Sequence, residues 1–598
     1  MIAGTKRKSD NSALDKTKKK FKKVTSEKPG GKPSQTAPPV KTDWGKLKAE
    51  KKQLKLTRKK SKSSYEVSVE AKKLYDELNS KKIEKSKKLQ VAADLYNLLK
   101  KADCLKKFVM AHDTARIIQC LFKHSPMELK KSIVEELAPV SVEMATSKYA
   151  HFCVMRILKY GDSSAKDKII NSFYGNIIRM TSHAISSKII DHAFLNLASP
   201  KQKAQMKQEF YGDIYKKQKD SSVCNLSDVY KDAKDLQVAT LSAVKSNLEH
   251  VANKKLIDNS LVHAVLLEYL EESKEPERAE IVSAYAPLIP HLVTTKEGCR
   301  SAILCFWYSP TKERRAIVKS LKEHIEKICL HEHGYLLILA IVNSMDDTKA
   351  IKKIIFDPVI TCIESLMQST SGRKVIEWFI SPADTETFHP SLISFLDTGL
   401  EFSKKEKSIR RKEIFDSVEE AFCTQICENT PFWFSDGHIG LITASILKKM
   451  SPTYFSKASE NLAKLVVDPE WKIQAAQPTV AKKNTSKISE TKLVSGIEDA
   501  GLHIALKKII KQDKDRAISN APTFSSYLSK FLTTENVSYW IKLNRACFIL
   551  VNLVENSTES VNSHIKDILT VDDNLSALKS QKHAGAKLLL EKLNLSDK

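Results

Sequence analysis

An amphipathic helical pattern returns along the chain at nearly regular intervals of about 36 residues, and this periodicity constrains the fold more than any other feature. The first copy spans residues 111–123, where Ile117, Ile118 and Leu121 recur at helical spacing. With Ala115 as the reference, the pattern predicts equivalent positions at His151, Ser186, Val262, Cys299, Tyr335 and Arg373. The step from Ser186 to Val262, which we call the long interval, equals about two periods and predicts a degenerate or missing unit. Units of this size stack to bury a shared core, so the pattern predicts an α-solenoid.

The composition agrees with an all-α fold. Only 16 of the 598 residues are glycine, well below the ordinary usage of about 7%. The longest apolar run, Tyr335–Val342, is too short for the roughly 20 residues that a membrane span needs. The eleven cysteines occur singly, without a CxxC pair, so we expect reduced core thiols, no metal site and no cofactor.

The positive charge is concentrated at the N-terminus. The formal net charge is +27, and residues 1–64 hold 21 Lys and Arg against 5 Asp and Glu, which leaves +11 for the rest of the chain. Such a distribution indicates a polyanionic partner, with nucleic acid ahead of membrane. Residues 1–43 are predicted to form a disordered basic tail. Its short basic clusters predict nuclear and nucleolar import signals at Lys6, Arg7, Lys8, Lys18, Lys19, Lys20, Lys22 and Lys23.

Three further regions follow the tail. Residues 44–103 are predicted to hold a basic helix and two N-terminal capping helices, at residues 65–78 and 85–99, that cover the end of the array. Residues 104–381 hold the repeats, interrupted by a polar stretch at residues 213–236 that we expect to be a loop or a degraded repeat, with a bend there as a further expectation. Residues 382–598 are predicted to be divergent repeats. In this last region we expect a mobile basic segment at residues 404–412 and a surface loop at residues 476–494.

Several of these stretches resemble a known family. Residues 113–119, Asp-Thr-Ala-Arg-Ile-Ile-Gln, are similar to the RNA-facing helix of Pumilio repeats, and residues 298–303 and 372–377 resemble it too. The basic helix from Trp44, together with AHDTARIIQC, KYAHFCVMRILKYG and SMDDTK, resembles the Puf-A or Pumilio-homologue-3 type, which has a Penguin-like C-terminal region. The resemblance implies an L-shaped solenoid of about eleven Pumilio-type repeats. It also implies a nuclear and nucleolar protein with a role in assembly of the large ribosomal subunit.

Sequence-specific Pumilio proteins read one base per repeat with two or three side chains. The resemblance places these side chains at Ala115/Arg116/Gln119, His151/Phe152/Met155, Ser186/Ser187/Ile190, Val262/His263/Leu266, Cys299/Arg300/Ile303, Tyr335/Leu336/Leu339 and Arg373/Lys374/Glu377. The third residue is apolar in most units and cannot hydrogen-bond a base edge, so a one-base-per-repeat code is broken. The side chains that remain available to contact nucleic acid are mainly positively charged.

The candidate nucleic-acid-binding residues are Arg116, Gln119, Phe152, Arg156, Lys188, His263, Arg300, Arg373 and Lys374. Lys and Arg contacts to phosphate give affinity without sequence readout. Phe152 and His263 are candidates for stacking on bases, but core packing is the favoured reading for both.

The sequence predicts a binding protein and not an enzyme, because no catalytic motif occurs. His331-Glu332-His333, for example, lacks the HExxH spacing of zinc proteases. We therefore predict a monomeric RNA-binding factor of ribosome biogenesis and rRNA processing. It would hold structured pre-ribosomal RNA, and double-stranded DNA, largely without sequence specificity, beside pre-60S assembly factors and away from membranes. Two alternatives stay open: a helical-repeat scaffold for protein interactions, and an mRNA-binding translational repressor, which the broken code disfavours.

Overall fold

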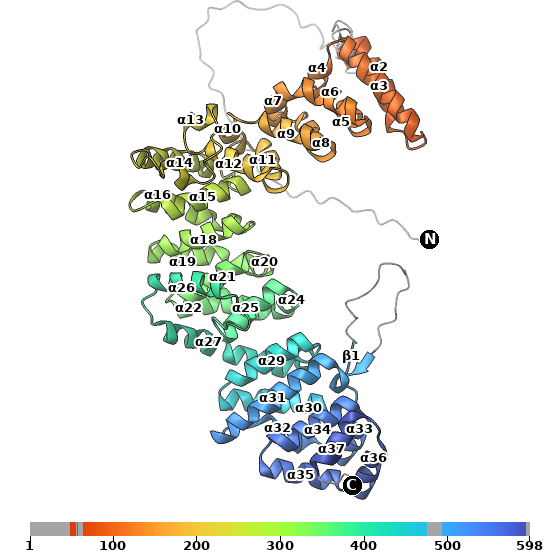
Figure 1. Cartoon of the computed structure of the whole chain (residues 1–598), viewed down its shortest axis with the longest axis vertical. Coiled ribbons are helices and arrows are strands. Elements are labelled where there is room, and N and C mark those ends of the chain that lie inside the picture. Colours follow the sequence, from red (N-terminus) through yellow and green to blue (C-terminus); the bar gives the residue numbers. More distant parts are fainter. Residues whose placement is uncertain (1–47, 55–56, 58–63, 475–492, 594–598) are drawn as a thin grey trace, which may run out of the picture. The chain divides into compact units, whose positions relative to one another are not determined.

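A computed structural model describes residues 48–54, 57, 64–474 and 493–593 (Figure 1). The predicted tail and its import signals lie outside these residues. The chain divides into two units, Met1–Glu66 and Val67–Lys598. The described part of the first unit contains a helix over residues 48–54, whose side chains are exposed. Helices form at both positions predicted for the capping pair, as α2 (Tyr65–Asn79) and α3 (Lys85–Lys101), and their capping role stays a prediction.

In the described part of the second unit, eleven helices pack in chain order, each against the next (Figure 1). These ladder helices are α5 (Ala115–His124), α8 (His151–Tyr160), α11 (Ser186–Asn196), α15 (Ser260–Glu272), α18 (Lys296–Tyr308), α21 (Tyr335–Ser344), α25 (Thr370–Ile380), α29 (Gly437–Lys449), α31 (Ala500–Ile518), α34 (Asn544–Asn556) and α37 (Ala584–Lys592). The predicted all-α solenoid of helical repeats is confirmed. The predicted bend and the region boundaries stay predictions.

Most ladder helices are the middle member of a repeat, between a shorter helix before them and an outer helix after them. The shorter helices include α4 (Leu105–Met110), α7 (Ser141–Thr146), α10 (Ile177–Thr181), α17 (Ile289–Leu292), α20 (Ile325–Leu330), α24 (Ile363–Met367), α28 (Thr430–Trp433) and α33 (Thr534–Ile541). The helix before α37 is α36 (Asp572–Ser580), which is as long as α37. The outer helices include α6 (Met127–Leu137), α9 (Ser163–Asn171), α12 (Pro200–Gln208), α16 (Glu277–Tyr285), α19 (Thr311–Leu321), α27 (Lys407–Glu428), α30 (Pro452–Val467), α32 (Phe524–Phe531) and α35 (Glu559–Leu569).

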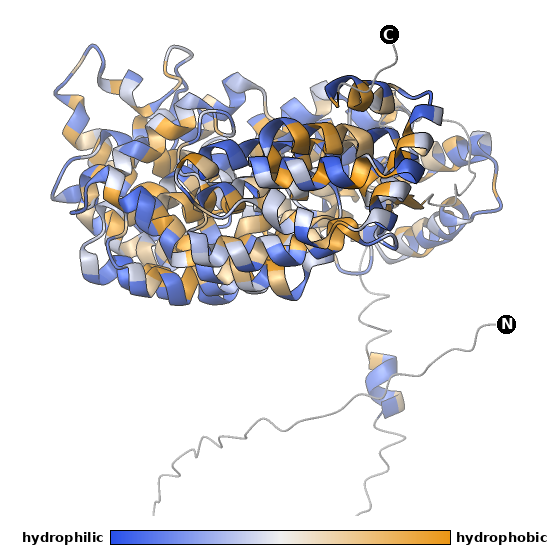
Figure 2. Cartoon of the chain, turned by 90° about the horizontal axis from the view of Figure 1, so that it is seen from below, coloured by the Kyte–Doolittle hydropathy of each residue, from blue (hydrophilic) through white to orange (hydrophobic). Residues whose placement is uncertain are grey.

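The remaining elements connect or extend these repeats. They are α13 (Asp213–Lys217), α14 (Leu236–Asn253), α22 (Thr348–Ile351), α23 (Asp357–Thr361), α26 (Pro390–Thr398), the π-helical η5 (Lys352–Phe356) and the 3₁₀ helices η1 (Ala138–Val140), η2 (Leu226–Tyr230), η3 (Ala286–Leu288), η4 (Lys322–His324), η6 (Gly399–Phe402) and η7 (Gly496–Glu498). Figure 2 shows hydrophilic and hydrophobic residues alternating along single helices, as an amphipathic array requires.

The long interval turns out to contain an insertion and not a missing repeat. α11 packs directly on α15, so the ladder is continuous. The Asn259 side-chain amide donates to the Ser187 carbonyl (2.9 Å), and the Ser260 backbone amide donates to the Asp191 carboxylate (2.8 Å). α13, η2 and α14 lie between the two ladder helices in sequence, and they add structure beside the array without breaking it. We call residues 213–259 the insertion.

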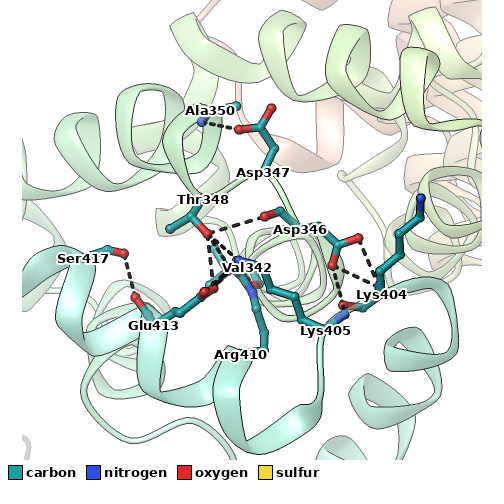
Figure 3. Close-up of polar contacts among 11 residues, drawn as sticks. Val342, Asp346, Asp347, Thr348, Ala350, Lys404, Lys405, Arg410, Glu413 and Ser417 are labelled. Carbon is teal, nitrogen blue, oxygen red and sulfur yellow. Dashed lines mark hydrogen bonds and ion pairs between the residues drawn. The ribbon is translucent and has the colours of Figure 1, made fainter.

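The basic segment at residues 404–412 is packed, contrary to the expected mobility (Figure 3). The Arg410 side chain is fully buried and donates from Nε (2.9 Å) and Nη2 (2.6 Å) to the Val342 carbonyl near the end of α21. Lys405 Nζ pairs with the Glu413 carboxylate at 2.6 Å. The Lys404 backbone amide donates to Asp346. A helix end leaves its last carbonyls without intrahelical partners, and the guanidinium satisfies one of them.

A short strand pair, β1 (Lys472–Gln474) with β2 (Leu493–Ser495), was not predicted. The strands are antiparallel, with Ile473 opposite Val494. Residues 493 and 494 therefore belong to a strand and not to the predicted loop, whose other residues lie outside the described part of the chain.

The core beneath η6 depends on a glycine. Trp307 of α18 is 2% exposed, and its indole Nε1 donates to Ser344 Oγ at 3.1 Å. A Cβ atom placed on Gly399 would lie 2.5 Å from two atoms of the Trp307 ring. Close packing leaves no room for that extra carbon.

We expect Gly399→Ala to destabilise the packing of η6 on α18 by about 1–3 kcal/mol, because the added methyl must displace a buried indole. Faster hydrogen exchange of the α18 and η6 amides measures the effect. Thr398→Ala, at the exposed neighbouring residue, is the control. Equal exchange in the two variants would contradict the close approach.

Candidate nucleic-acid interface

Side-chain caps fix which residues of successive repeats are equivalent. Thr114 Oγ1 donates to the Phe108 carbonyl six residues earlier (2.7 Å), and Ser186 Oγ donates in the same way to the Met180 carbonyl (2.8 Å). Ser186 is therefore the equivalent of Thr114. The residue equivalent to Ala115 is Ser187, one position later than the sequence spacing predicted.

The burial pattern supports the same register. In each early ladder helix, a pair of adjacent buried residues begins two positions after the reference. The pairs are Ile117/Ile118, Cys153/Val154, Ile189/Ile190 and Val265/Leu266. The fourth reference is thus His263 and not Val262. With both corrections, the references Ala115, His151, Ser187, His263, Cys299 and Tyr335 are evenly spaced on each side of the long interval.

The corrected register aligns an exposed row on the first three ladder helices. Arg116, Phe152 and Lys188 occupy one equivalent position, and Phe152 is 53% exposed. Lys123 lies two helical turns after Arg116, and Lys159 lies two turns after Phe152; both lysines are also exposed. We call Arg116, Lys123, Lys159 and Lys188 the basic row. Sequence reasoning missed Lys123 and Lys159, although their separation by one repeat was a usable signal.

The basic row carries charge that the chain does not neutralise. Within the described residues none of its four cations has an acidic partner within ion-pair distance. Because α5 packs on α8 and α8 on α11, the cations lie on neighbouring helices. A row of unpaired cations on adjacent helices can contact successive anionic groups of an extended ligand.

The third position of the code remains unsuited to reading bases. After correction it holds Gln119, Met155, Asp191, Leu267, Ile303, Leu339 and Glu377. Three of these, Leu267, Ile303 and Leu339, are buried. Asp191 is polar, but its carboxylate accepts from the Ser260 amide and hydroxyl at 2.8 and 2.7 Å and so caps the next ladder helix. Gln119 is half-buried.

The structure places His263 inside the array, so the core-packing alternative holds for it. The imidazole is fully buried, and its Nδ1 lies 2.8 Å from Thr295 Oγ1. Burial lowers the pKa of His263 to about 4, so the ring is neutral at physiological pH. A ring in this position cannot stack on a base, and we leave it out of the interface.

The remaining candidates are half-buried and contact other parts of the protein. The Arg156 guanidinium donates to Tyr160 Oη (3.3 Å), and that of Arg300 lies 4.9 Å from the Phe395 ring centre. Arg373 Nη1 donates to the Met367 carbonyl (2.9 Å), and Lys374 Nζ lies 3.4 Å from Tyr335 Oη. These contacts orient the four cations without neutralising them, and their role in binding stays a prediction.

Comparison with known proteins identifies the family. The Protein penguin of Drosophila melanogaster is 39% identical over 645 residues, which cover 95% of this chain and 87% of that protein. The chain belongs to the Puf-A family. Pumilio homolog 3 of Rattus norvegicus, in the same family, is 30% identical over 588 residues, which cover 96% of this chain and 87% of that protein. The resemblance to the Puf-A type is thereby confirmed.

A solved Puf-A structure shares the fold. The crystal structure of human Puf-A in complex with DNA matches with a TM-score of 0.76 and 27% identity, over 89% of this chain and all of that chain. A family model described as the CPL (NUC119) domain matches residues 368–522. In this Puf-A family member, that match includes the ladder helices α25, α29 and α31.

The described ranges hold neither a candidate membrane span nor a candidate metal site. No helix there has both the length and the low polarity that crossing a membrane takes. No group of three or more His, Cys, Asp or Glu side chains there is arranged to hold a metal ion.

Proposed function

We propose that the chain is a nucleolar RNA-binding protein that assists assembly of the large ribosomal subunit. In this proposal it holds structured RNA, or duplex DNA, by phosphate contacts and largely without sequence specificity. The observation that carries the proposal is the basic row: four cations on three adjacent ladder helices, beside third-position residues of which five in seven are apolar or committed to the fold. A human relative whose structure is described as a complex with DNA supports a nucleic-acid partner.

The cellular part of the proposal rests on the family and on the tail. The basic clusters within residues 1–43 are proposed to direct import into the nucleus and nucleolus. Pre-60S assembly factors are the proposed neighbours of a monomeric, non-catalytic chain. A solenoid suits such a role because its extended surface contacts a long ligand and other proteins together.

A salt titration of the full chain tests the binding mode. Unrelated single-stranded and double-stranded RNAs and a Pumilio-type element are compared. We expect similar affinities for the unrelated sequences, with log K falling linearly against log salt, because released counterions dominate phosphate binding. Binding confined to the Pumilio element would favour the repressor alternative. An absence of binding would favour the protein-interaction scaffold.

We expect Phe152→Ala to weaken single-stranded RNA binding selectively. The ring is 53% exposed and lies between Arg116 and Lys188 in the equivalent row. Base stacking on an aromatic ring contributes about 1–3 kcal/mol per base, whereas a duplex keeps its bases paired inside. Paired anisotropy titrations with single-stranded and duplex RNA measure the difference. Phe152→Tyr is the control that keeps the ring, and equal losses on both RNAs would exclude a stacking role.

A further inference from the structure

A pocket lies between the third repeat and the insertion. Its volume is about 690 Å³. The third repeat supplies Arg179, Ser182 and His183 from α10 and the turn after it. The insertion supplies Lys216 from α13 and His250 and Lys254 from α14 and its C-terminal end. We call the cavity that these six residues help to line the insertion pocket. Sequence reasoning did not find it, because residues 213–236 read only as a loop or a degraded repeat.

A buried carboxylate holds the two sides of the pocket together. Glu209 is fully buried and accepts hydrogen bonds from the backbone amides of Gly175 (2.6 Å) and Ile177 (2.9 Å). Lys219 of the insertion donates to the same carboxylate at 2.8 Å. Gly175 has φ +84°, a conformation that glycine adopts without steric cost. The pocket therefore has a fixed wall and is not a gap between mobile loops.

The pocket carries an excess of positive charge. Glu209 lines it, but its negative charge already has Lys219 and two backbone amides as partners. Lys216 pairs with the exposed Asp213 at 2.7 Å. Arg179 and Lys254 are both exposed, and neither forms an ion pair with any residue that the structure describes. Two cations are thus available to an anionic ligand.

A buried hydroxyl in the pocket also lacks a partner. Ser182 Oγ is inaccessible and forms no hydrogen bond within the described chain. A buried polar group without a partner costs about 1–3 kcal/mol. A turn of this side chain toward the pocket would let an acceptor oxygen of a ligand recover part of that cost. Unpaired guanidinium and ammonium groups beside a spare hydroxyl donor suit the oxygens of a phosphate.

The size of the pocket and its place in the chain narrow the ligand further. Ligand pockets typically have volumes of about 300–1,000 Å³, which accommodates a phosphate with its attached nucleoside, whereas a double helix is far too wide to enter. The third repeat contributes both Arg179, in α10, and Lys188 of the basic row, in α11. A nucleic-acid strand that lies along the basic row can therefore make a second contact with the third repeat, at Arg179.

We propose that the insertion pocket binds a backbone phosphate of an unpaired nucleotide in the bound nucleic acid. This inference rests on the proposed function and deepens it, because the pocket adds preference for single-stranded or unpaired segments to the general attraction for phosphate. The insertion, which accounts for the long interval between Ser187 and His263, supplies Lys216, His250 and Lys254 to the pocket and so has a role in binding.

The double variant Arg179→Ala/Lys254→Ala in the full chain tests the proposal. Because each phosphate contact contributes about −0.7 to the salt slope for a single strand and the pocket holds one phosphate, we expect the slope for single-stranded RNA to become less steep by about 0.7. The loss of that contact corresponds to an affinity loss of about fourfold near 0.15 M salt. The double variant should bind duplex RNA as tightly as the matched control does.

The matched control is Lys217→Ala/Lys231→Ala, which removes two exposed cations of the insertion that do not line the pocket. Equal slopes for the two variants on single-stranded RNA would overturn the pocket while leaving the proposed function intact. A loss by the Arg179→Ala/Lys254→Ala variant on duplex RNA as large as its loss on single-stranded RNA would overturn it too. If the unmodified chain binds no RNA, both proposals fail. Thermal unfolding of both variants should match that of the parent chain, because all four side chains are exposed.

Discussion

Replacing Arg116, Lys123, Lys159 and Lys188 together by alanine is expected to weaken binding to duplex nucleic acid by about 10³-fold near 0.15 M salt. Each phosphate contact contributes about −0.9 to the slope of log K against log salt for a duplex, so four contacts account for about −3.6. These side chains are exposed and, among the described residues, without acidic partners. Their loss should therefore leave the fold unchanged.

Fluorescence anisotropy of labelled duplexes over a salt series measures both the affinity and the slope. A control of equal charge replaces four exposed lysines on later repeats, at Lys319, Lys322, Lys327 and Lys352. If this control loses as much affinity as the row variant, binding follows net charge and the row is not an interface. If neither variant changes the slope, the basic N-terminal residues carry the affinity instead.

Replacing Arg410 by alanine is expected to cost about 3–5 kcal/mol locally, the usual range when one partner of a buried charged network is removed. The fully buried guanidinium joins α27 to the end of α21 through the Val342 carbonyl, and its Nη1 lies 3.4 Å from the Glu413 carboxylate. Burial lowers the pKa of Arg410, which the neighbouring Glu413 opposes. Without the guanidinium, the carbonyl loses its donor and a cavity remains.

Hydrogen exchange of the α21 and α27 amides is the appropriate measurement, because repeat arrays open locally and lack a single unfolding free energy. Arg411→Ala is the matched control. Its guanidinium pairs with Asp397 at 2.8 Å at a partly exposed site, where an ion pair contributes about 0.2–1 kcal/mol. Equal protection in the two variants would show that the buried guanidinium does not hold α27 in place.

The fold was largely accessible from the sequence because apolar spacing reports directly on helical faces. Ile117, Ile118 and Leu121 predict one buried face, and all three are buried. The register of the repeats was harder to predict from the sequence. Ser186 and Ser187 are both small and polar. The hydrogen bond from Ser186 Oγ to the Met180 carbonyl and the buried pair Ile189/Ile190 separate the capping residue from the reference position.

The parts that failed depend on contacts between residues far apart in sequence. The composition of the lysine-rich segment around Arg410 predicts a solvated stretch. The structure instead places Arg410 against the Val342 carbonyl, 68 residues earlier in the chain. For His263 the favoured reading, core packing, is correct, but its partner Thr295 in the next repeat could not be named from the sequence. The insertion pocket combines α10 with α14, and no local pattern joins them. Local periodicity cannot predict such pairings, because the solenoid sets them only after it has stacked.

The strand pair β1–β2 suggests a practical use for this region. Lys472 lies opposite Ser495, so the chain leaves the helical array and returns to it at neighbouring positions. Lengthening a closed loop costs only about 0.6 kcal/mol for each doubling of its length. A fluorescent domain or affinity tag inserted between these strands should be accommodated with little loss of stability, far in sequence from the basic row. Such a labelled protein would allow its complexes to be followed or captured with both termini unaltered.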